Sequence, residues 1–161
     1  MKTFILAAIT ALAVADKSDF PGDSMFHAGC HMSTTLVSTT CDSFKAKAEQ
    51  LIKDNVDTGD DSTKGQMSLK EDGADYIWSK RITLNKKYTD DQLFEFTQDG
   101  GDCKVSAKSR SESVSYLDNA VNFCNMWNIL SRVDGFSGKY DLGSCSVKPD
   151  QGGEATKCKR Y

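Results

Sequence analysis

Six cysteines, spread between positions 30 and 158, set the strongest constraint on how this 161-residue chain can fold. The first segment, MKTFILAAITALAVA (1–15), combines one lysine, a short apolar run and the small residues Ala13 and Ala15. This pattern is typical of a secretory signal peptide that is cleaved after Ala15. An even number of cysteines in a secreted chain indicates disulfide bonds. We therefore expect a secreted, extracellular protein with three disulfides among Cys30, Cys41, Cys103, Cys124, Cys145 and Cys158.

Six cysteines allow fifteen connectivities, and the sequence does not choose among them. Cys145 and Cys158 flank a loop that is rich in glycine and lysine and poor in apolar residues. A local bridge between these two cysteines is plausible on this ground. It would stabilise the fold by roughly 3 kcal/mol in the chain-entropy description of disulfides. The other pairings stay open.

Charge and hydropathy narrow the class of partner. The formal net charge is −3 and the basic residues are scattered, so neither a nucleic acid nor an anionic membrane is expected as a partner of this mildly acidic chain. No segment approaches the roughly 20 apolar residues of a membrane-spanning helix. We expect extracellular proteins or matrix as partners.

Hydrophobic periodicity predicts an irregular N-terminal arm over residues 16–40 and a single α+β domain over 41–161 with a cysteine-stapled C-terminal tail. Within the domain, apolar residues recur at helical spacing over 44–53. A second helix is expected over 119–133, capped by Asp118.

Between these helices the apolar residues alternate with period two. Asp72-Gly73 and Gly100-Gly101 are turn signals between such segments. We expect an antiparallel sheet of about four strands packed by two helices, and one short strand in the tail at 144–147. The four strand segments are 67–72, 76–84, 93–96 and 103–107.

Two segments contain the residue types of a metal site without its spacing. The segment DNVDTGDDS (54–62) fails the EF-hand pattern because Val56 and Gly65 stand at ligand positions. We interpret it as a solvated acidic loop, in which weak calcium binding is still open. HAGCH (27–31) is a poor zinc site, since Cys30 is expected in a disulfide. We expect no metal site and no cofactor.

The sequence predicts no catalytic residues. No serine stands in a G-x-S-x-G turn, and both histidines, His27 and His31, lie in the N-terminal arm. The paired carboxylates at 71–72 and 90–91 are expected in turns, where contact with water makes catalytic tuning difficult. We therefore expect a protein that is not an enzyme.

The segment SRSESVSYLDNAVNFCNMWNIL (109–130) is dense in hydroxyl and amide groups. Asn119, Asn122 and Asn125 recur every three residues, which predicts one polar stripe on the second helix. Buried amides need hydrogen-bond partners. The preceding strand offers three hydroxyls: Ser106, Ser109 and Ser111.

Residues 40–133 resemble the core of the family called domain of unknown function 1499. The shared features are a D-D-x-x-F-x-F strand (90–96), an S-R-S turn (109–111), and Asp118 with Asn122 at the last helix. The chain is similar in particular to short secreted members from protists and algae that carry C-x-V-x-A-x-S-R-S and N-x-C-N-M-W-N. The resemblance implies an architecture and a bridge between Cys103 and Cys124. It implies no reaction, because no activity is established for the family.

We expect Arg110, buried at the end of a strand, to pair with Asp118 at the helix N-terminus, where the helix dipole favours a carboxylate. Ser109, Ser111 and Asn122 would complete the hydrogen bonding. This set is interpreted as a structural clasp, with a ligand site as the alternative.

The sequence is most consistent with a secreted, non-enzymatic protein that acts by interaction or as an extracellular-matrix component. The alternative is an extracellular carrier of a small apolar ligand, held in a cavity between the sheet and the helices. Five aromatic residues would line that cavity: Tyr76, Trp78, Phe94, Phe96 and Trp127.

Overall fold

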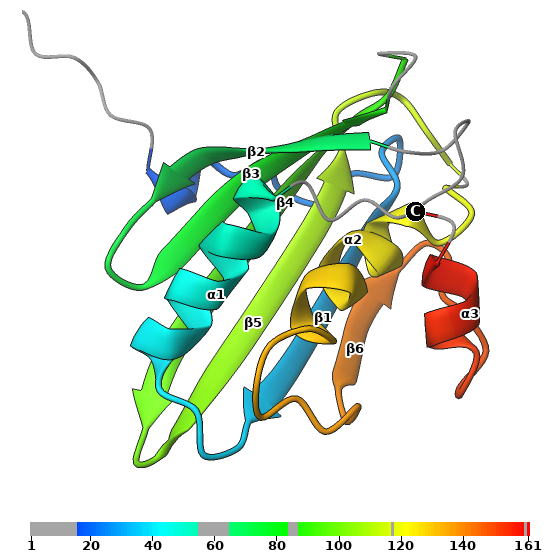
Figure 1. Cartoon of the computed structure of the whole chain (residues 1–161). Coiled ribbons are helices and arrows are strands. Elements are labelled where there is room, and N and C mark those ends of the chain that lie inside the picture. Colours follow the sequence, from blue (N-terminus) through cyan, green and yellow to red (C-terminus); the bar gives the residue numbers. More distant parts are fainter. Residues whose placement is uncertain (1–15, 55–64, 84–86, 117, 160) are drawn as a thin grey trace, which may run out of the picture.

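The computed structural model describes residues 16–54, 65–83, 87–116, 118–159 and 161. The expected signal peptide (1–15) lies outside the described residues, as does nearly all of the acidic loop considered for weak calcium binding. Within the described residues, one antiparallel sheet carries helices on one of its faces (Figure 1).

The sheet has six strands in the order β2-β3-β4-β5-β1-β6, and every neighbouring pair is antiparallel. The strands are β1 (Gly29–Leu36), β2 (Gly65–Asp72), β3 (Tyr76–Thr83), β4 (Thr89–Asp99), β5 (Asp102–Ser111) and β6 (Asp141–Cys145). The helices are α1 (Cys41–Lys53), α2 (Val121–Leu130) and α3 (Glu154–Cys158), and a short 3-10 helix, η1 (Lys17–Asp19), precedes the sheet.

The α+β class and the four strands β2 to β5 are confirmed, but the expectation of about four strands and two helices understates the fold. Residues 16–40 are not an irregular arm, since they contain β1, which lies between β5 and β6 inside the sheet. Its inward positions include Cys30 and Thr34, so its apolar alternation is weak in the sequence. The tail also contains more structure than expected, with β6 at 141–145 and α3 after it.

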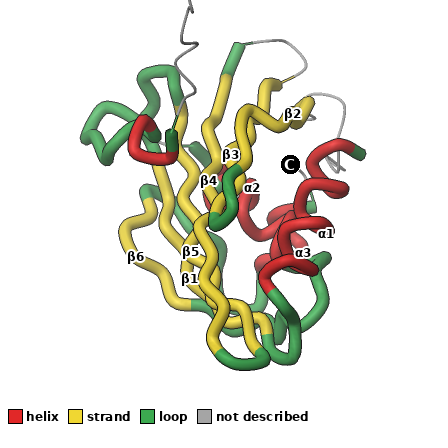
Figure 2. The backbone as a smooth tube through the Cα atoms, turned by 90° about the vertical axis from the view of Figure 1, so that its left-hand side faces the viewer, coloured by secondary structure: helices red, strands yellow, loops and turns green. Residues whose placement is uncertain are grey.

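The two faces of the sheet have different roles. Figure 2 shows α1, α2 and α3 on one side of the strands and η1 on the other. On β5 the buried residues alternate strictly, with Cys103, Val105 and Ala107 toward the helices and Lys104 and Ser106 toward the helix-free face. Every second side chain of a strand points to the same face, so the main core forms on the helix side, and a smaller buried cluster of Tyr76, Trp78 and Leu93 lies apart from it.

Both longer helices bury apolar side chains against that face. On α1 the buried positions include Phe44, Ala48 and Ile52, which recur at helical spacing, and Thr40 Oγ1 accepts a hydrogen bond from Ser43 N to cap the helix. The helix α2 is apolar on most sides, because the sheet covers one side and α3 another. Burial of a side chain such as Phe44 stabilises the fold by about 2–3 kcal/mol.

Three disulfides join segments that are distant in the sequence. Cys30–Cys145 links β1 to β6, Cys41–Cys103 links α1 to β5, and Cys124–Cys158 links α2 to α3. Both expected pairings, Cys145 with Cys158 and Cys103 with Cys124, are wrong. Cys145 lies opposite Cys30 in the β1–β6 ladder, whereas Cys158 belongs to a helix that packs on α2. The loop between 145 and 158 therefore does not close on itself.

Among the described residues, no helix is long and apolar enough to cross a membrane.

Removal of the α2–α3 bridge tests this connectivity. The double variant Cys124→Ala/Cys158→Ala should lower the free energy of unfolding by about 4 kcal/mol, because the unfolded chain loses a cross-link over a sequence separation of 34 residues. Urea denaturation measures the change. As a control, mass spectrometry of an unreduced digest should detect a peptide pair linked through Cys41 and Cys103 in the parent and in the variant. A peptide joining Cys145 to Cys158 in the parent would contradict the fold of the tail.

Candidate functional site

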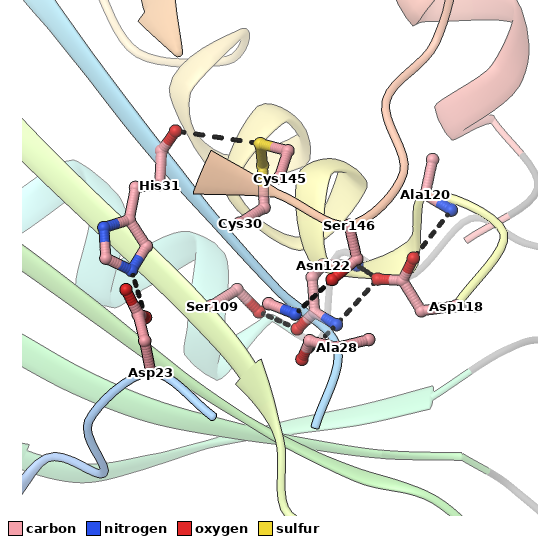
Figure 3. The surroundings of a disulfide bond; sticks show 11 residues. Asp23, Ala28, Cys30, His31, Ser109, Asp118, Ala120, Asn122, Cys145 and Ser146 are labelled. Atoms are coloured by element: carbon pink, nitrogen blue, oxygen red, sulfur yellow. Dashed lines mark hydrogen bonds and ion pairs between the residues drawn. A yellow bond between two sulfur atoms is a disulfide. The ribbon is translucent and has the colours of Figure 1, made fainter. Parts of the chain in front are cut away.

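Four of the five residues expected to form the clasp lie together between the sheet and the start of α2: Ser109, Ser111, Asp118 and Asn122. Asn122 is fully buried and is the centre of the cluster. Its Nδ2 donates to Asp118 Oδ2 (2.7 Å), to Ser111 Oγ (3.1 Å) and to the Ala28 carbonyl (3.1 Å), and its Oδ1 accepts from Ser109 Oγ (2.8 Å). Figure 3 shows Asn122 between Ser109, Ala28 and Asp118.

Asp118 holds the beginning of α2. Its carboxylate accepts hydrogen bonds from Ala120 N (3.2 Å) and Asn122 N (2.8 Å), two amides that have no partner within the helix. The helix starts at Val121 and not at 119, because Asn119 and Ala120 have φ values of 53° and 71° in the left-handed region. Asp118 therefore caps the helix from two residues further upstream than expected.

The same cluster extends to two residues outside the expected clasp, Asn125 from the predicted polar stripe and Asp90 from β4. Asn125 Nδ2 donates to Ser109 Oγ and to Asp90 Oδ2, both at 3.1 Å, and Ser111 Oγ donates to Asp90 Oδ1 at 2.7 Å. Asp90 was expected in a solvated turn, but it is the second residue of β4 and only 3% exposed. The missed signal is its two-residue spacing from Gln92 and Phe94, which face the core with it.

The polar stripe predicted for α2 is confirmed in part. Asn122 and Asn125 are buried in the cluster, whereas Asn119 is exposed ahead of the helix. Ser109 and Ser111 provide hydroxyl partners, but Ser106 points to the opposite face of β5. These contacts engage two of the four serines and two of the four asparagines in the segment.

Burial controls the charge of Asp90. Removal from water raises the pKa of this carboxyl above its usual 3.8, and hydrogen bonds from Ser111 and Asn125 offset part of the rise. The guanidinium of Arg81 also favours the charged form, with Nη1 3.9 Å from Asp90 Oδ2. The cluster thus keeps an acid inside the protein with several donors around it.

Arg110 does not belong to the clasp. Ser109 and Ser111 point toward the helices, so Arg110 between them points to the helix-free face, and it forms no ion pair with Asp118. The strand alternation alone requires this outcome. The expected Arg110–Asp118 pair is therefore wrong, and the helix dipole and backbone amides stabilise the Asp118 carboxylate instead.

On the helix-free face, Arg110 lies in an open cleft of about 440 Å³. The cleft is formed by the start of β1, the end of β5, the end of β6 with Ser146 after it, and the loop 23–27. Most of the residues that line it are polar or charged, among them Asp23, Ser24, His27, Ser144 and Ser146. Cys145, bonded to Cys30, closes one side.

An apolar surface lies next to this cleft. Four large apolar side chains on the loops 24–28 and 112–116 are exposed to water; we call them the loop patch: Met25 (82% exposed), Phe26 (51%), Val114 (66%) and Tyr116 (64%). Met25 also lines the Arg110 cleft, so the two surfaces adjoin.

Both histidines have structural partners. His27 Nδ1 donates to the Ser111 carbonyl at 3.0 Å, and His31 Nε2 lies 2.9 Å from Asp23 Oδ1, a contact visible in Figure 3. Among the described residues, no three His, Cys, Asp or Glu side chains are grouped so that they could hold a metal ion.

The aromatic residues considered for a carrier cavity do not surround one space. Tyr76 and Trp78 form a small cluster with Leu93 and Phe20, apart from the main core. Phe94 and Phe96 pack against Phe44 in the main core. Trp127 stacks on Phe123 and meets Phe136 and Tyr140.

Comparison with known proteins leaves the chain without an assigned relative: no family model, no curated protein and no solved structure matches it.

The separation of Arg110 from the buried cluster can be tested by thermal and chemical denaturation. Asn122→Ala should cost about 3 kcal/mol of folding free energy, because it removes four hydrogen bonds and leaves buried partners unsatisfied. Arg110→Ala should stay within about 0.5 kcal/mol of the parent, since no hydrogen bond is lost. Asn128→Ala, which removes a single bond to the Cys158 carbonyl, is the matched control with an intermediate loss. A large loss of folding free energy in Arg110→Ala would support the expected Arg110–Asp118 clasp after all.

Asp90 should also impose a pH dependence. Its pKa is raised in the folded protein, so folding favours the protonated form. The stability that this group contributes is present below 3.8 and is lost as pH rises through the raised folded-state pKa. When urea denaturation is measured across this pH range, Asp90→Asn should lose the part of the fall in unfolding free energy that comes from Asp90. Asp99→Asn is the control, since Lys104 lowers the pKa of this exposed carboxyl and gives the opposite sign. If the free energy of unfolding of Asp90→Asn depends on pH as steeply as that of the parent, the raised pKa of Asp90 is contradicted.

Proposed function

We propose that this protein is secreted and works without catalysis, by binding an extracellular partner or matrix through the loop patch. The observation that supports this most directly is the gathering of four exposed apolar side chains on two adjacent loops. Single exposed apolar residues are ordinary, but a contiguous group commonly marks an interaction surface. Among the described residues, only Val37 and Tyr88 are comparably large, apolar and exposed elsewhere.

The two loops hold the patch in a fixed shape. Ala28 N donates to the Ser115 carbonyl at 2.7 Å, and Ser115 N donates to the Phe26 carbonyl at 2.9 Å. The rings of Phe26 and Tyr116 lie edge to face, with 6.3 Å between their centres. A surface that is ordered before binding loses less conformational entropy when a partner docks. This favours recognition over accidental exposure.

A non-catalytic role is consistent with the use of the polar residues. The serines, asparagines and carboxylates of the buried cluster bond to one another and lie under α2, away from the described clefts. His27 and His31 are bound to a carbonyl and to a carboxylate. General acid–base work needs a group within reach of a substrate, and these groups are committed to the fold.

Secretion is supported by the disulfides together with the N-terminal sequence. Three bridges are compatible with an oxidising compartment, where such bonds persist. We favour retention in a matrix as the form of this interaction. The loop patch and the Arg110 cleft adjoin, and a matrix polymer is long enough to contact both. The carrier alternative has less support, since its five aromatic residues are divided among separate clusters.

Loss of the patch should release the protein from its partner. In cells that normally make it, the tagged parent should accumulate in the detergent-resistant extracellular fraction. Phe26→Ser/Tyr116→Ser should shift most of the protein into the medium without lowering its melting temperature, because both side chains are largely exposed. Immunoblots of the two fractions measure the shift.

The double variant Val37→Ser/Tyr88→Ser is the control, as it removes two exposed apolar side chains elsewhere and should leave the distribution unchanged. A parent found entirely in the medium would contradict matrix retention. Equal retention of the Phe26→Ser/Tyr116→Ser variant would contradict the role of the patch.

A further inference from the structure

We infer that the Arg110 cleft binds the sulfate ester of an extracellular polysaccharide. This inference rests on the proposed function and deepens it, by giving the chemistry of the matrix component that the loop patch would meet.

The guanidinium of Arg110 has no hydrogen bond or ion pair with another described residue, and its Nε is buried without a partner. A partly buried cation is costly unless an anion compensates it. The carboxylate beside it in the sheet, Asp91, is already engaged by Trp78 Nε1 at 2.8 Å and by Lys70 at 3.7 Å. The carboxylate that follows β5, Glu112, is bound to Lys80. Arg110 is therefore left available for an anion from outside the chain.

Space and further donors surround this cation. On its other side the neighbour in the sheet is Gly29, where a side chain would lie 3.2 Å from the Ser109 carbonyl and 3.9 Å from Arg110 Cβ. Ser24 Oγ accepts from Phe26 N and Ser146 Oγ accepts from Gly29 N, both at 3.2 Å. Each hydroxyl keeps its proton for another acceptor. The cleft thus combines a guanidinium with hydroxyl donors, a set that suits an oxyanion with several oxygens.

The charge balance selects a monoanion. Asp23 also lines the cleft, and its carboxylate is held by His31 Nε2 at 2.9 Å. A phosphate monoester carries a charge of about −1.5 to −2 near neutral pH, which one arginine beside an aspartate compensates poorly. A carboxylate would use only two of the donors. A sulfate ester carries one charge and presents three free oxygens, so it matches both the charge and the donors.

The surface next to the cleft favours a sulfate that is attached to a sugar. Met25 belongs to both the cleft and the loop patch, in which the rings of Phe26 and Tyr116 lie edge to face. Aromatic side chains present a large flat surface with low conformational freedom, which fits the C–H face of a sugar ring. General attraction of polyanions is not expected for a chain with net charge −3, so binding must come from such a local site.

Equilibrium binding to the purified, oxidised protein tests the inference, with dextran sulfate as the probe and unsulfated dextran and carboxymethyl dextran of equal length as references. The parent should bind dextran sulfate and neither reference. Arg110→Gln should bind it about tenfold more weakly, the loss expected for one charge-assisted contact. Lys104→Gln removes a cation from the same face of β5 and should bind like the parent. Inorganic sulfate should compete only at far higher concentration, because it lacks the sugar.

Equal affinity of the parent and Arg110→Gln for dextran sulfate would overturn the inference, provided that both proteins melt alike. So would equal affinity for carboxymethyl dextran, or complete competition by inorganic sulfate at matched concentration, which would indicate a site for a free ion. These results leave the proposed function standing if Phe26→Ser/Tyr116→Ser still loses matrix retention. If the patch variant is retained while Arg110→Gln binds weakly, the proposed function fails and the sulfate site remains.

Discussion

The side-chain amide of Asn122 joins three parts of the chain at one buried point: the residue before β1, the end of β5 and the start of α2. It bonds to the residue before β1 through the Ala28 carbonyl, to β5 through Ser109 and Ser111, and to the capping carboxylate of Asp118. A buried amide of this kind specifies position more than it adds stability, since each bond replaces one to water. It fixes where α2 begins and how it lies on the sheet. The neighbouring loop 112–116 is held separately, by backbone bonds of Ser115 to Phe26 and Ala28.

The alternation of β5 separates two sets of requirements. Ser109 and Ser111 face inward and bond to buried partners. Arg110 between them faces outward and has no buried partner among the described residues. A surface residue can change without altering the core only when its side chain has no buried partner, and Arg110 meets this condition. The short S-R-S segment therefore contributes at once to the scaffold and to the surface, with no residue shared between them.

Much of the architecture was predictable because periodicity reports burial directly. The α1 pattern, the period-two segments from 67 to 107 and the turns between them reflect local spacing, and they were predicted correctly. What failed depends on contacts between distant residues. β1 has small or polar residues at most of its positions, Thr34 among the inward ones, and its place between β5 and β6 is not visible in its own spacing. The disulfides follow from that same placement, so spacing along the chain could not give them.

The candidate site divides in the same way. Ser109, Ser111, Asp118 and Asn122 could be grouped because a helix start beside a strand of serines implies mutual hydrogen bonding. Arg110 was grouped with them by proximity in the sequence, although its position between two inward residues demanded the other face. Asp90 could not be predicted for a different reason: the pairing of β4 with β5 decides which carboxylate meets Ser111. The loop patch depends on the bridge between His27 and Ser115, which joins loops far apart in the chain.

The pattern of the three bridges bears on how the protein is made. Cys41 and Cys103 can join as soon as β5 has emerged, but Cys30 and Cys124 must wait for partners at 145 and 158. During that interval two reactive thiols coexist in a partly synthesised chain, and disulfide exchange allows them to form a premature bond. A premature bond must be exchanged before the native bridges can form, which a disulfide isomerase accelerates. The yield of native protein should therefore depend on such an isomerase, even though the finished fold needs none to stay folded.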